Sequence, residues 1–286
     1  MRIIKKKKGK NAYFYIQHSI RKGNKVITKE IYLGKKIPGN IEIIKKGLEQ
    51  EYKEELYKKL EKIKENFQKE WRKYPKNIQE KEKEEIAIAF TYNTNAIEGS
   101  IISLEETREI MKEGIAPNKP LRDIKETENH YKLFLKMLNE KEKISNKLLL
   151  QWHKEIFSDT KKDIVGVFRN YMIRVGEYRA PDWQEVEHLM KQYIKFLNES
   201  KINSVELSAR AHYRFEKIHP FGDGNGRIGR LIINHILWHE GYPMIIIEYK
   251  KRRSYYNALN KNEEGFVHYF LRRYITVHKG RIISTD

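Results

Sequence analysis

The chain has 286 residues, of which 39% are hydrophobic, and this is enough apolar material for one sizeable core of about 200 residues and a small appendage. It contains no cysteine, which excludes disulfides, thiolate metal sites and a cysteine nucleophile. It also lacks an apolar run of eighteen residues and a signal-peptide pattern, so we expect a cytoplasmic protein without membrane spans.

The net charge of +19 is concentrated at the N-terminus, where residues 1–40 carry twelve Lys or Arg and a single acidic residue, Glu30. Clustered positive charge favours a polyanionic partner, either nucleic acid or an acidic protein. We expect such a partner to contact the N-terminal segment rather than the whole protein.

Two stretches of this basic segment, residues 12–20 and 26–33, are rich in β-branched and aromatic residues and flank the turn pair Gly23-Asn24. They predict a β-hairpin or small meander over residues 1–38. Its tyrosines alternate with lysines, which leaves two interpretations. The rings stack on bases while the lysines contact phosphates, or the aromatic face packs on the next helix. We favour the second, because it is the more common arrangement.

Residues 39–81 predict one long, charged amphipathic helix that ends at Pro75. Its apolar residues recur at a spacing near 3.5, at Leu48, Tyr52, Leu56, Leu60, Ile63 and Phe67. We expect this apolar seam to pack either on the rest of the chain or on a second copy, which would make the protein a homodimer.

The next helix is predicted to begin at Glu82 and to lead into Thr94-Asn95-Ala96-Ile97-Glu98-Gly99, where the glycine is a helix stop signal. Amphipathic patterns then predict helices over 104–112, 124–138 and 146–157, the last with Ser145 as its N-cap. Residues 166–181 change to an alternating pattern that predicts a surface hairpin.

The stretch from His219 to Arg230 lies between helical patterns over 204–217 and 228–238. Glycines at 222, 224 and 226 let the backbone adopt positive φ and approach a ligand closely, and the free N–H groups of the following helix turn face the same way. Arg227 shares a face of that turn with Arg230, where the helix dipole disfavours a cation unless an anion is near. The stretch therefore predicts a phosphate-binding corner beside a titratable base. Further helices are predicted over 249–259 and 266–278.

The sequence His219-Pro-Phe-Gly-Asp-Gly-Asn-Gly-Arg-Ile-Gly-Arg230 resembles the H-P-F-x-(D/E)-G-N-G-R-x-x-R signature of the Fic (Fido) family, with every fixed position present. The resemblance implies a mainly α-helical bundle with a β-hairpin flap over residues 82–286. It also implies transfer of AMP from ATP to a Tyr, Thr or Ser hydroxyl of a target protein. In this reaction His219 would be the general base and Asp223 would hold Mg²⁺.

The nucleotide contacts that the resemblance implies fall into three groups. The phosphates would lie against the signature, at Asp223, Gly224, Asn225, Gly226, Arg227, Ile228, Gly229 and Arg230. The flap would border the nucleotide through Val175, Gly176, Glu177 and Tyr178. The adenine side would consist of Tyr255 and Tyr256 with Asn262 or Glu263, at a point where this chain departs from its close relatives.

The helix end at 94–99 resembles the inhibitory motif of the same family. The resemblance implies that Glu98 forms an ion pair with Arg230 and occupies the place of the ATP γ-phosphate, so that the enzyme inhibits itself. In some relatives the same glutamate supports removal of AMP from the modified target, and the net direction of the reaction stays open. Two other functions also stay open. One is a nucleic-acid-binding or toxin–antitoxin-like regulator that uses the Fic core as a nucleotide sensor, and the other is a transferase that uses another nucleotide donor.

Overall fold

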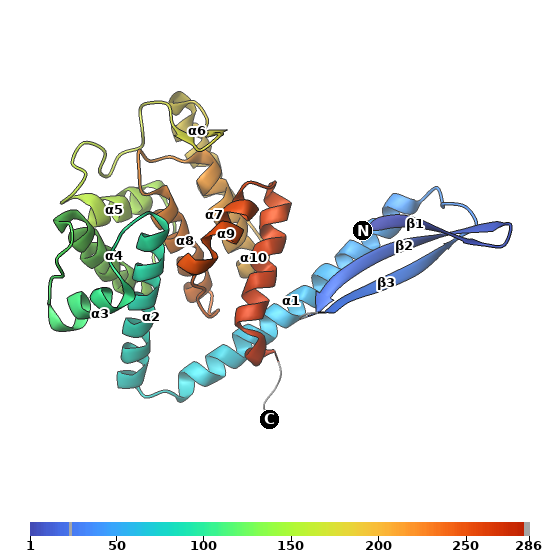
Figure 1. Cartoon of the computed structure of the whole chain (residues 1–286), viewed down its shortest axis with the longest axis horizontal. Coiled ribbons are helices and arrows are strands. Elements are labelled where there is room, and N and C mark those ends of the chain that lie inside the picture. The colour runs from blue at the N-terminus through green and yellow to red at the C-terminus, as the bar shows by residue number, and fades with distance from the viewer. Residues whose placement is uncertain (23–24, 283–286) are drawn as a thin grey trace. The chain divides into compact units, whose positions relative to one another are not determined.

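The computed structural model in Figure 1 describes residues 1–22 and 25–282. The chain forms two compact units, residues 1–58 and residues 59–286. The predicted turn pair Gly23-Asn24 and residues 283–286, with which the predicted catalytic domain ends, lie outside the described residues.

The first unit contains a three-stranded antiparallel sheet in the order β1-β2-β3 (Figure 1). The strands are β1 (Arg2–Lys8), β2 (Asn11–Lys22) and β3 (Lys25–Gly34). The predicted meander is confirmed, but β1 was not foreseen, because four consecutive lysines are unfavourable in strands. All seven residues of β1 pair with β2, so the neighbouring strand overrides the local preference.

The tyrosines of the sheet lie on the face opposite its buried side. Alternation along β2 separates Tyr13 and Tyr15 from Ile16, which is only 1% exposed. Tyr32 of β3 packs against both tyrosines and is 54% exposed. Tyr13 and Tyr15 are half-buried, and the fully buried residue Ile16 lies on the opposite face, so packing of the tyrosines on the next helix stays a prediction.

The second unit is built from the C-terminal part of α1 (Ile41–Lys73) and further helices. These are α2 (Lys76–Ile97), α3 (Leu104–Glu113), α4 (Leu121–Asn139), α5 (Asn146–Phe157), α6 (Val186–Glu199), α7 (Ser204–Ile218), α8 (Asn225–His239), α9 (Arg252–Leu259) and α10 (Glu263–Val277). A small hairpin pairs β4 (Arg174–Val175) with β5 (Tyr178–Arg179), and 3₁₀ turns lie at Trp183–Glu185, Tyr249–Lys251 and Lys279–Arg281.

Helix α8 is the centre of this unit, as Figure 1 shows, and nearly all of its residues are buried. Its apolar side chains, among them Ile228, Leu231 and Ile232, join a core shared with α2, α4, α5, α6 and α7. The glycine corner at the start of α8 is therefore held by the most enclosed element of the fold.

Several boundaries differ from the predictions. Helix α2 begins at Lys76 rather than Glu82, so the predicted division into 39–81 and 82–286 falls inside a helix. Beyond residue 58 the apolar seam of α1 packs within the second unit, where Leu60 and Ile63 are fully buried and the Phe67 ring lies 6.2 Å from that of Trp238. The β pattern over 166–181 forms only two-residue strands. Helix α6 was not predicted, although its buried residues Val186, Met190 and Tyr193 recur at helical spacing.

Candidate active site

His219 caps the C-terminal end of α7 in a left-handed conformation. Its φ of 51° is the only positive φ of a non-glycine residue in the described part of the chain. Strained backbone of this kind is concentrated at functional sites, where the surroundings enforce it. Burial lowers the pKa of His219 below its ordinary value. The imidazole is therefore neutral near pH 7 and able to accept a proton.

Arg169 fixes the backbone on which His219 stands. Its guanidinium donates to the carbonyl oxygens of His219 at 2.8 Å, Tyr171 at 2.9 Å and Pro181 at 2.6 Å. Arg169 is only 4% exposed and is well placed against the carbonyls at the helix end. The Arg169 guanidinium thus links the backbone of His219 to both ends of the hairpin segment, Tyr171 and Pro181. Sequence reasoning missed this residue, since an isolated arginine in a β-like stretch carries no pattern.

Asn225 shapes the loop after His219. Its side-chain amide donates to the carbonyl of Phe221 at 2.8 Å and accepts from the Phe221 N–H at 2.9 Å. Both amide atoms are engaged, and Asn225 is buried. The side chain of this predicted phosphate contact therefore holds the turn, and its backbone N–H is the group that remains for a ligand.

The first turn of α8 offers unpaired backbone donors. The helix bonds begin with the N–H of Ile228 donating to Gly224 at 3.1 Å, which leaves the preceding N–H groups without a helical partner. Gly224 adopts a φ of 80°, and a Cβ there would overlap the ring of Phe157. A glycine is required at this position, and the result is an anion-binding helix terminus. The Ile228 side chain itself points into the core.

The predicted ion pair between Glu98 and Arg230 is present. The Arg230 Nη2 lies 2.6 Å from Glu98 Oε1, and its Nε donates to Thr94 Oγ1 at 2.6 Å. Although burial opposes the charge, the Glu98 carboxylate holds the pKa of Arg230 above its ordinary value. A Cβ on Gly226 would overlap Glu98 Oε1, so only glycine leaves room for the carboxylate on this turn.

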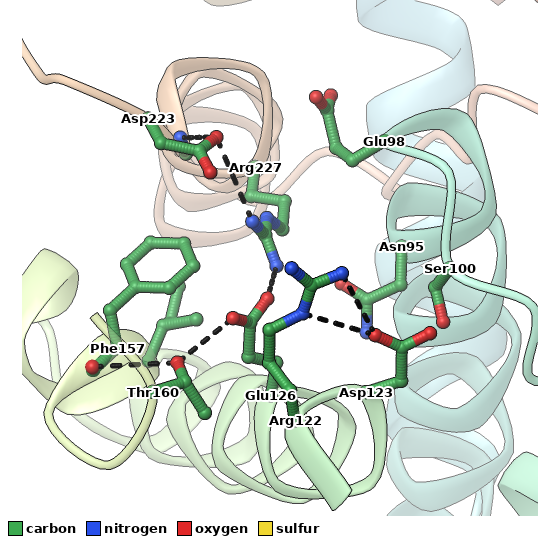
Figure 2. Close-up of polar contacts among 12 residues, drawn as sticks. Asn95, Glu98, Ser100, Arg122, Asp123, Glu126, Phe157, Thr160, Asp223 and Arg227 are labelled. Atoms are coloured by element: carbon green, nitrogen blue, oxygen red, sulfur yellow. Dashed lines mark hydrogen bonds and ion pairs between the residues drawn. The ribbon is translucent and has the colours of Figure 1, made fainter. Parts of the chain in front are cut away.

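Arg227 is part of a second buried charge network. Its guanidinium bonds Glu126 of α4, and Figure 2 shows it between the carboxylates of Glu126 and Asp223. Lys161 binds Asp223 at 2.6 Å and Glu126 at 3.3 Å. Although burial opposes the charge, Arg227 and Lys161 hold the pKa of Glu126 below its ordinary value. Neither Glu126 nor Lys161 was predicted, because each lies far from the signature in sequence.

A polar cavity of about 210 Å³ opens beside these charged residues, and Figure 2 shows Glu98, Glu126 and Arg227 on its wall. It is lined by Asn95, Glu98, Ser100, Arg122, Asp123, Glu126, Lys161, Asp223 and Arg227. Among the described residues no cluster of three His, Cys, Asp or Glu could hold a metal alone. Mg²⁺ typically binds through one or two carboxylates together with phosphate oxygens and water, and Asp223 on the cavity wall fits that role. Although burial opposes the charge, Lys161 and Arg227 hold the pKa of Asp223 below its ordinary value, so this carboxylate is charged.

The Fic/DOC family model matches residues 143–237, which run from just before α5 to α8 and include His219 and the glycine corner. These residues form a Fic/DOC domain. The chain is 31% identical over 199 residues to protein adenylyltransferase fic-1 of Caenorhabditis elegans, a match covering 66% of this chain and 39% of that protein. It is 32% identical over 197 residues to protein adenylyltransferase Fic of Drosophila ananassae, covering 66% and 40%. The chain thus spans about two fifths of the length of these curated relatives.

Solved structures agree on the fold. Fic-1 from C. elegans superimposes with a TM-score of 0.71 at 25% identity, over 86% of this chain and 78% of that chain. A Fic domain containing signalling protein from Bacteroides thetaiotaomicron has a TM-score of 0.69 at 23% identity, over 78% of this chain and 96% of that chain. The similarity therefore extends well beyond the Fic/DOC domain itself.

The predicted flap of the Fic/DOC domain is anchored beside the base. Tyr178 donates its phenol to the Lys217 carbonyl at 2.7 Å, and the Lys217 ammonium lies 4.3 Å from the ring centroid. Gly176 turns the hairpin with a φ of 59°, while Val175 and Glu177 are exposed. The flap is thus attached to α7 two residues before His219.

On the predicted adenine side, the two tyrosines have different surroundings from Asn262 and Glu263. The hydroxyl of Tyr256 donates to Ile97, next to Glu98, at 3.2 Å, and buried Tyr255 bonds His212 at 2.7 Å. Asn262 and Glu263 have structural partners instead: Asn262 caps α10 by accepting from Gly265, and Glu263 binds Arg210 and Arg214. Of these four residues, Tyr256 is the one that is both exposed, at 41%, and next to Glu98, whereas the Tyr255 hydroxyl is buried against His212.

Glu216 is a mostly buried carboxyl that faces His212 and His219. Its two oxygens lie 3.9 Å from the Nδ1 atoms of His212 and His219, and Oε1 has no hydrogen-bond partner. Burial, opposed in part by Arg230, raises the pKa of Glu216 to about 7. A group of this kind links the protonation state of the site to folding stability.

We expect Arg169→Lys to lower the free energy of unfolding by about 2–4 kcal/mol, because a single ammonium cannot replace a planar fork that reaches three carbonyls. Chemical denaturation measures this, and limited proteolysis of residues 171–181 reports the loosened hairpin. The control is Arg174→Lys in exposed β4. Equal behaviour of the two variants would remove the positioning role of Arg169.

We expect Glu216→Gln to alter the pH dependence of stability. The folded pKa of Glu216 lies above the unfolded value, so the folded state binds the proton more tightly and the wild type loses stability as pH rises. Between pH 5.5 and pH 8 the wild type should lose about 2 kcal/mol more than the variant. Urea titrations at both pH values measure the difference. Exposed Glu199→Gln is the control. Parallel pH profiles for wild type and Glu216→Gln would contradict the raised pKa.

Proposed function

We propose that this chain is a protein adenylyltransferase that transfers AMP from ATP to a Tyr, Thr or Ser hydroxyl of a target protein. The observation that carries the proposal is the position of His219, a neutral and mostly buried base that one short loop separates from a helix N-terminus with two buried arginines. The relatives in C. elegans and D. ananassae, which carry the name protein adenylyltransferase, support the same reaction.

In the proposed reaction the target hydroxyl attacks the α-phosphorus of ATP. A new P–O bond forms to the hydroxyl oxygen as the bond to pyrophosphate breaks, and His219 accepts the hydroxyl proton. No covalent enzyme intermediate is needed. The N–H groups of Gly226 and Arg227 would bind phosphate oxygens, and Arg227 would counter the charge on the leaving pyrophosphate. Tyr256 would border the adenosine, whereas Asn262 and Glu263 are left out because the fold already engages them.

Asp223 would hold Mg²⁺. When bound, the metal supplies positive charge that neutralises the phosphate groups. The Lys161 ammonium is paired with one Asp223 oxygen, so Mg²⁺ would compete with this ion pair for the carboxylate.

Glu98 would inhibit the enzyme by occupying the position of the γ-phosphate at Arg230. The two arginines of the corner differ in a way that supports this role. The carboxylate on Arg227 belongs to Glu126, which is 6% exposed and also accepts from Thr160. The carboxylate on Arg230 belongs to Glu98 at a helix end, with 27% of its side chain exposed. An incoming phosphate would displace the more accessible carboxylate, because both anions compete for one guanidinium.

The central experiment incubates wild type, Glu98→Gly and Glu98→Gly/His219→Ala with labelled ATP, Mg²⁺ and cell lysate. We expect labelling of proteins to rise at least about tenfold in the single variant, because the nucleotide no longer has to break the buried Glu98–Arg230 pair in order to bind. Labelling should vanish in the double variant, which lacks the base. Exposed Glu113→Gly is the control. After labelling, an excess of unlabelled ATP is added, and the loss of label from the proteins over time measures removal of AMP.

Equal weak labelling by all variants would refute both the inhibitory and the catalytic assignment. Parallel reactions with labelled GTP, CTP and UTP test the donor. A preference for one of these nucleotides would assign the chain to transfer of a different group.

The metal assignment is tested with Asp223→Asn in the Glu98→Gly background. We expect the Mg²⁺-dependent rate to fall by about a hundredfold or more while the thermal unfolding midpoint changes little, because the amide keeps the shape and loses the charge. Rates are measured across a Mg²⁺ titration, with Asp163→Asn as control. An unchanged titration curve would rule out Asp223 as the metal ligand.

A further inference from the structure

The open face of the N-terminal sheet carries a cluster of three tyrosines. The strand register places Tyr13, Tyr15 and Tyr32 on one face, with Tyr15 directly opposite Tyr32. The ring of Tyr32 lies 6.2 Å from that of Tyr13 and 5.3 Å from that of Tyr15. Tyr32 is 54% exposed, so this cluster is accessible from solvent.

Cations on β1 surround the cluster. Alternation along the strand brings Arg2, Lys6 and Lys8 to the tyrosine face and turns Lys5 and Lys7 to the other. The Lys6 ammonium lies 5.2 Å from the centroid of the Tyr15 ring. The tyrosine face of the sheet therefore places aromatic rings and positive charges next to one another.

Negative charge is almost absent from this segment. Residues 1–40 contain one acidic residue, Glu30, against twelve Lys or Arg. Glu30 lies on the tyrosine face and is paired with Lys6, and it also accepts from Gln17. The remaining cations of the face, Arg2 and Lys8, have no acidic partner among the described contacts and are exposed.

The opposite face of the sheet is buried in part. It holds Ile16, which is only 1% exposed, together with half-buried Phe14 and with Ile31, which is 42% exposed. A sheet with one face buried normally presents polar residues on the other. The tyrosine cluster breaks that pattern, and burial within the unit does not account for it.

We propose that the open face of the N-terminal sheet binds single-stranded nucleic acid, with bases stacked on Tyr13, Tyr15 and Tyr32 and phosphates held by Arg2, Lys6 and Lys8. Aromatic platforms with a positively charged track are the general means of binding single strands. In a duplex the base faces are stacked inside, so a duplex would leave the rings without a role. An acidic protein would contact the lysines through its carboxylates, but it offers no regular series of flat rings along its charged groups, as a single strand does.

The test uses the full-length chain and fluorescently labelled 20-nucleotide single-stranded DNA, single-stranded RNA of the same sequence, and the corresponding DNA duplex. Binding is measured by fluorescence anisotropy between 50 and 300 mM salt, with polyglutamate as competitor. We expect single strands to bind more tightly than the duplex. The slope of log K against log salt should be about −2, from three phosphate contacts.

Two pairs of variants on opposite faces separate the specific contacts from general charge. Tyr32→Ala should weaken binding about 5- to 150-fold with an unchanged salt slope, because stacking is lost, whereas Ile31→Ala, 42% exposed on the other face, should have little effect. Lys8→Ala should reduce the salt slope by about 0.7, and Lys7→Ala by less. His219→Ala should bind as wild type does, which keeps this test independent of the adenylyltransferase proposal.

Several results would overturn the proposal. Absence of binding at 50 mM salt would do so, and so would equal losses for Lys7→Ala and Lys8→Ala with no effect of Tyr32→Ala, which indicates diffuse charge. Duplex binding that matches single strands would point to a phosphate-only surface. Efficient competition by polyglutamate would point to an acidic protein as the partner.

Discussion

The buried guanidinium of Arg230 is the constraint on which the catalytic unit depends. A cation that is 2% exposed needs an anion beside it, and the end of α2 supplies one through Glu98 and a hydroxyl through Thr94. The glycine at 226 leaves the space that the carboxylate fills. Any ligand that reaches Arg230 must therefore offer comparable negative charge, which is why the proposed phosphate site coincides with the position of the Glu98 carboxylate.

The base is held by a separate set of contacts. Arg169 binds the backbone carbonyl of His219 from below, and Tyr178 binds the preceding turn of α7. These contacts come from the hairpin segment. The hairpin, which would receive the target, and His219, which would take its proton, are therefore held in place by the same contacts. The strained backbone at His219 is stabilised by neighbours on both sides of the loop.

Local sequence patterns predicted most of the helices and turns of this protein, but they did not predict which charged residues would pair. The glycine corner, the helices α3, α5 and α7 and the N-cap at Ser145 follow from spacing and turn chemistry within a few residues. By contrast, Arg169, Glu126 and Lys161 carry no local signal, and Asn225 proved to shape the loop with its side chain. The sequence left the adenosine contact open between Asn262 and Glu263, and in the fold Asn262 caps α10 while Glu263 binds two arginines.

The sequence by itself determined the helical periodicity, the chemistry of residues 219–230 and the positive N-terminus, because each is encoded among near neighbours along the chain. The tertiary structure alone decided which buried charges meet, such as Arg227 with Glu126 across 101 positions, and which face of the sheet carries the tyrosines. Ion pairs between distant segments and the choice of a buried face depend on how whole elements pack, and no local pattern records that packing.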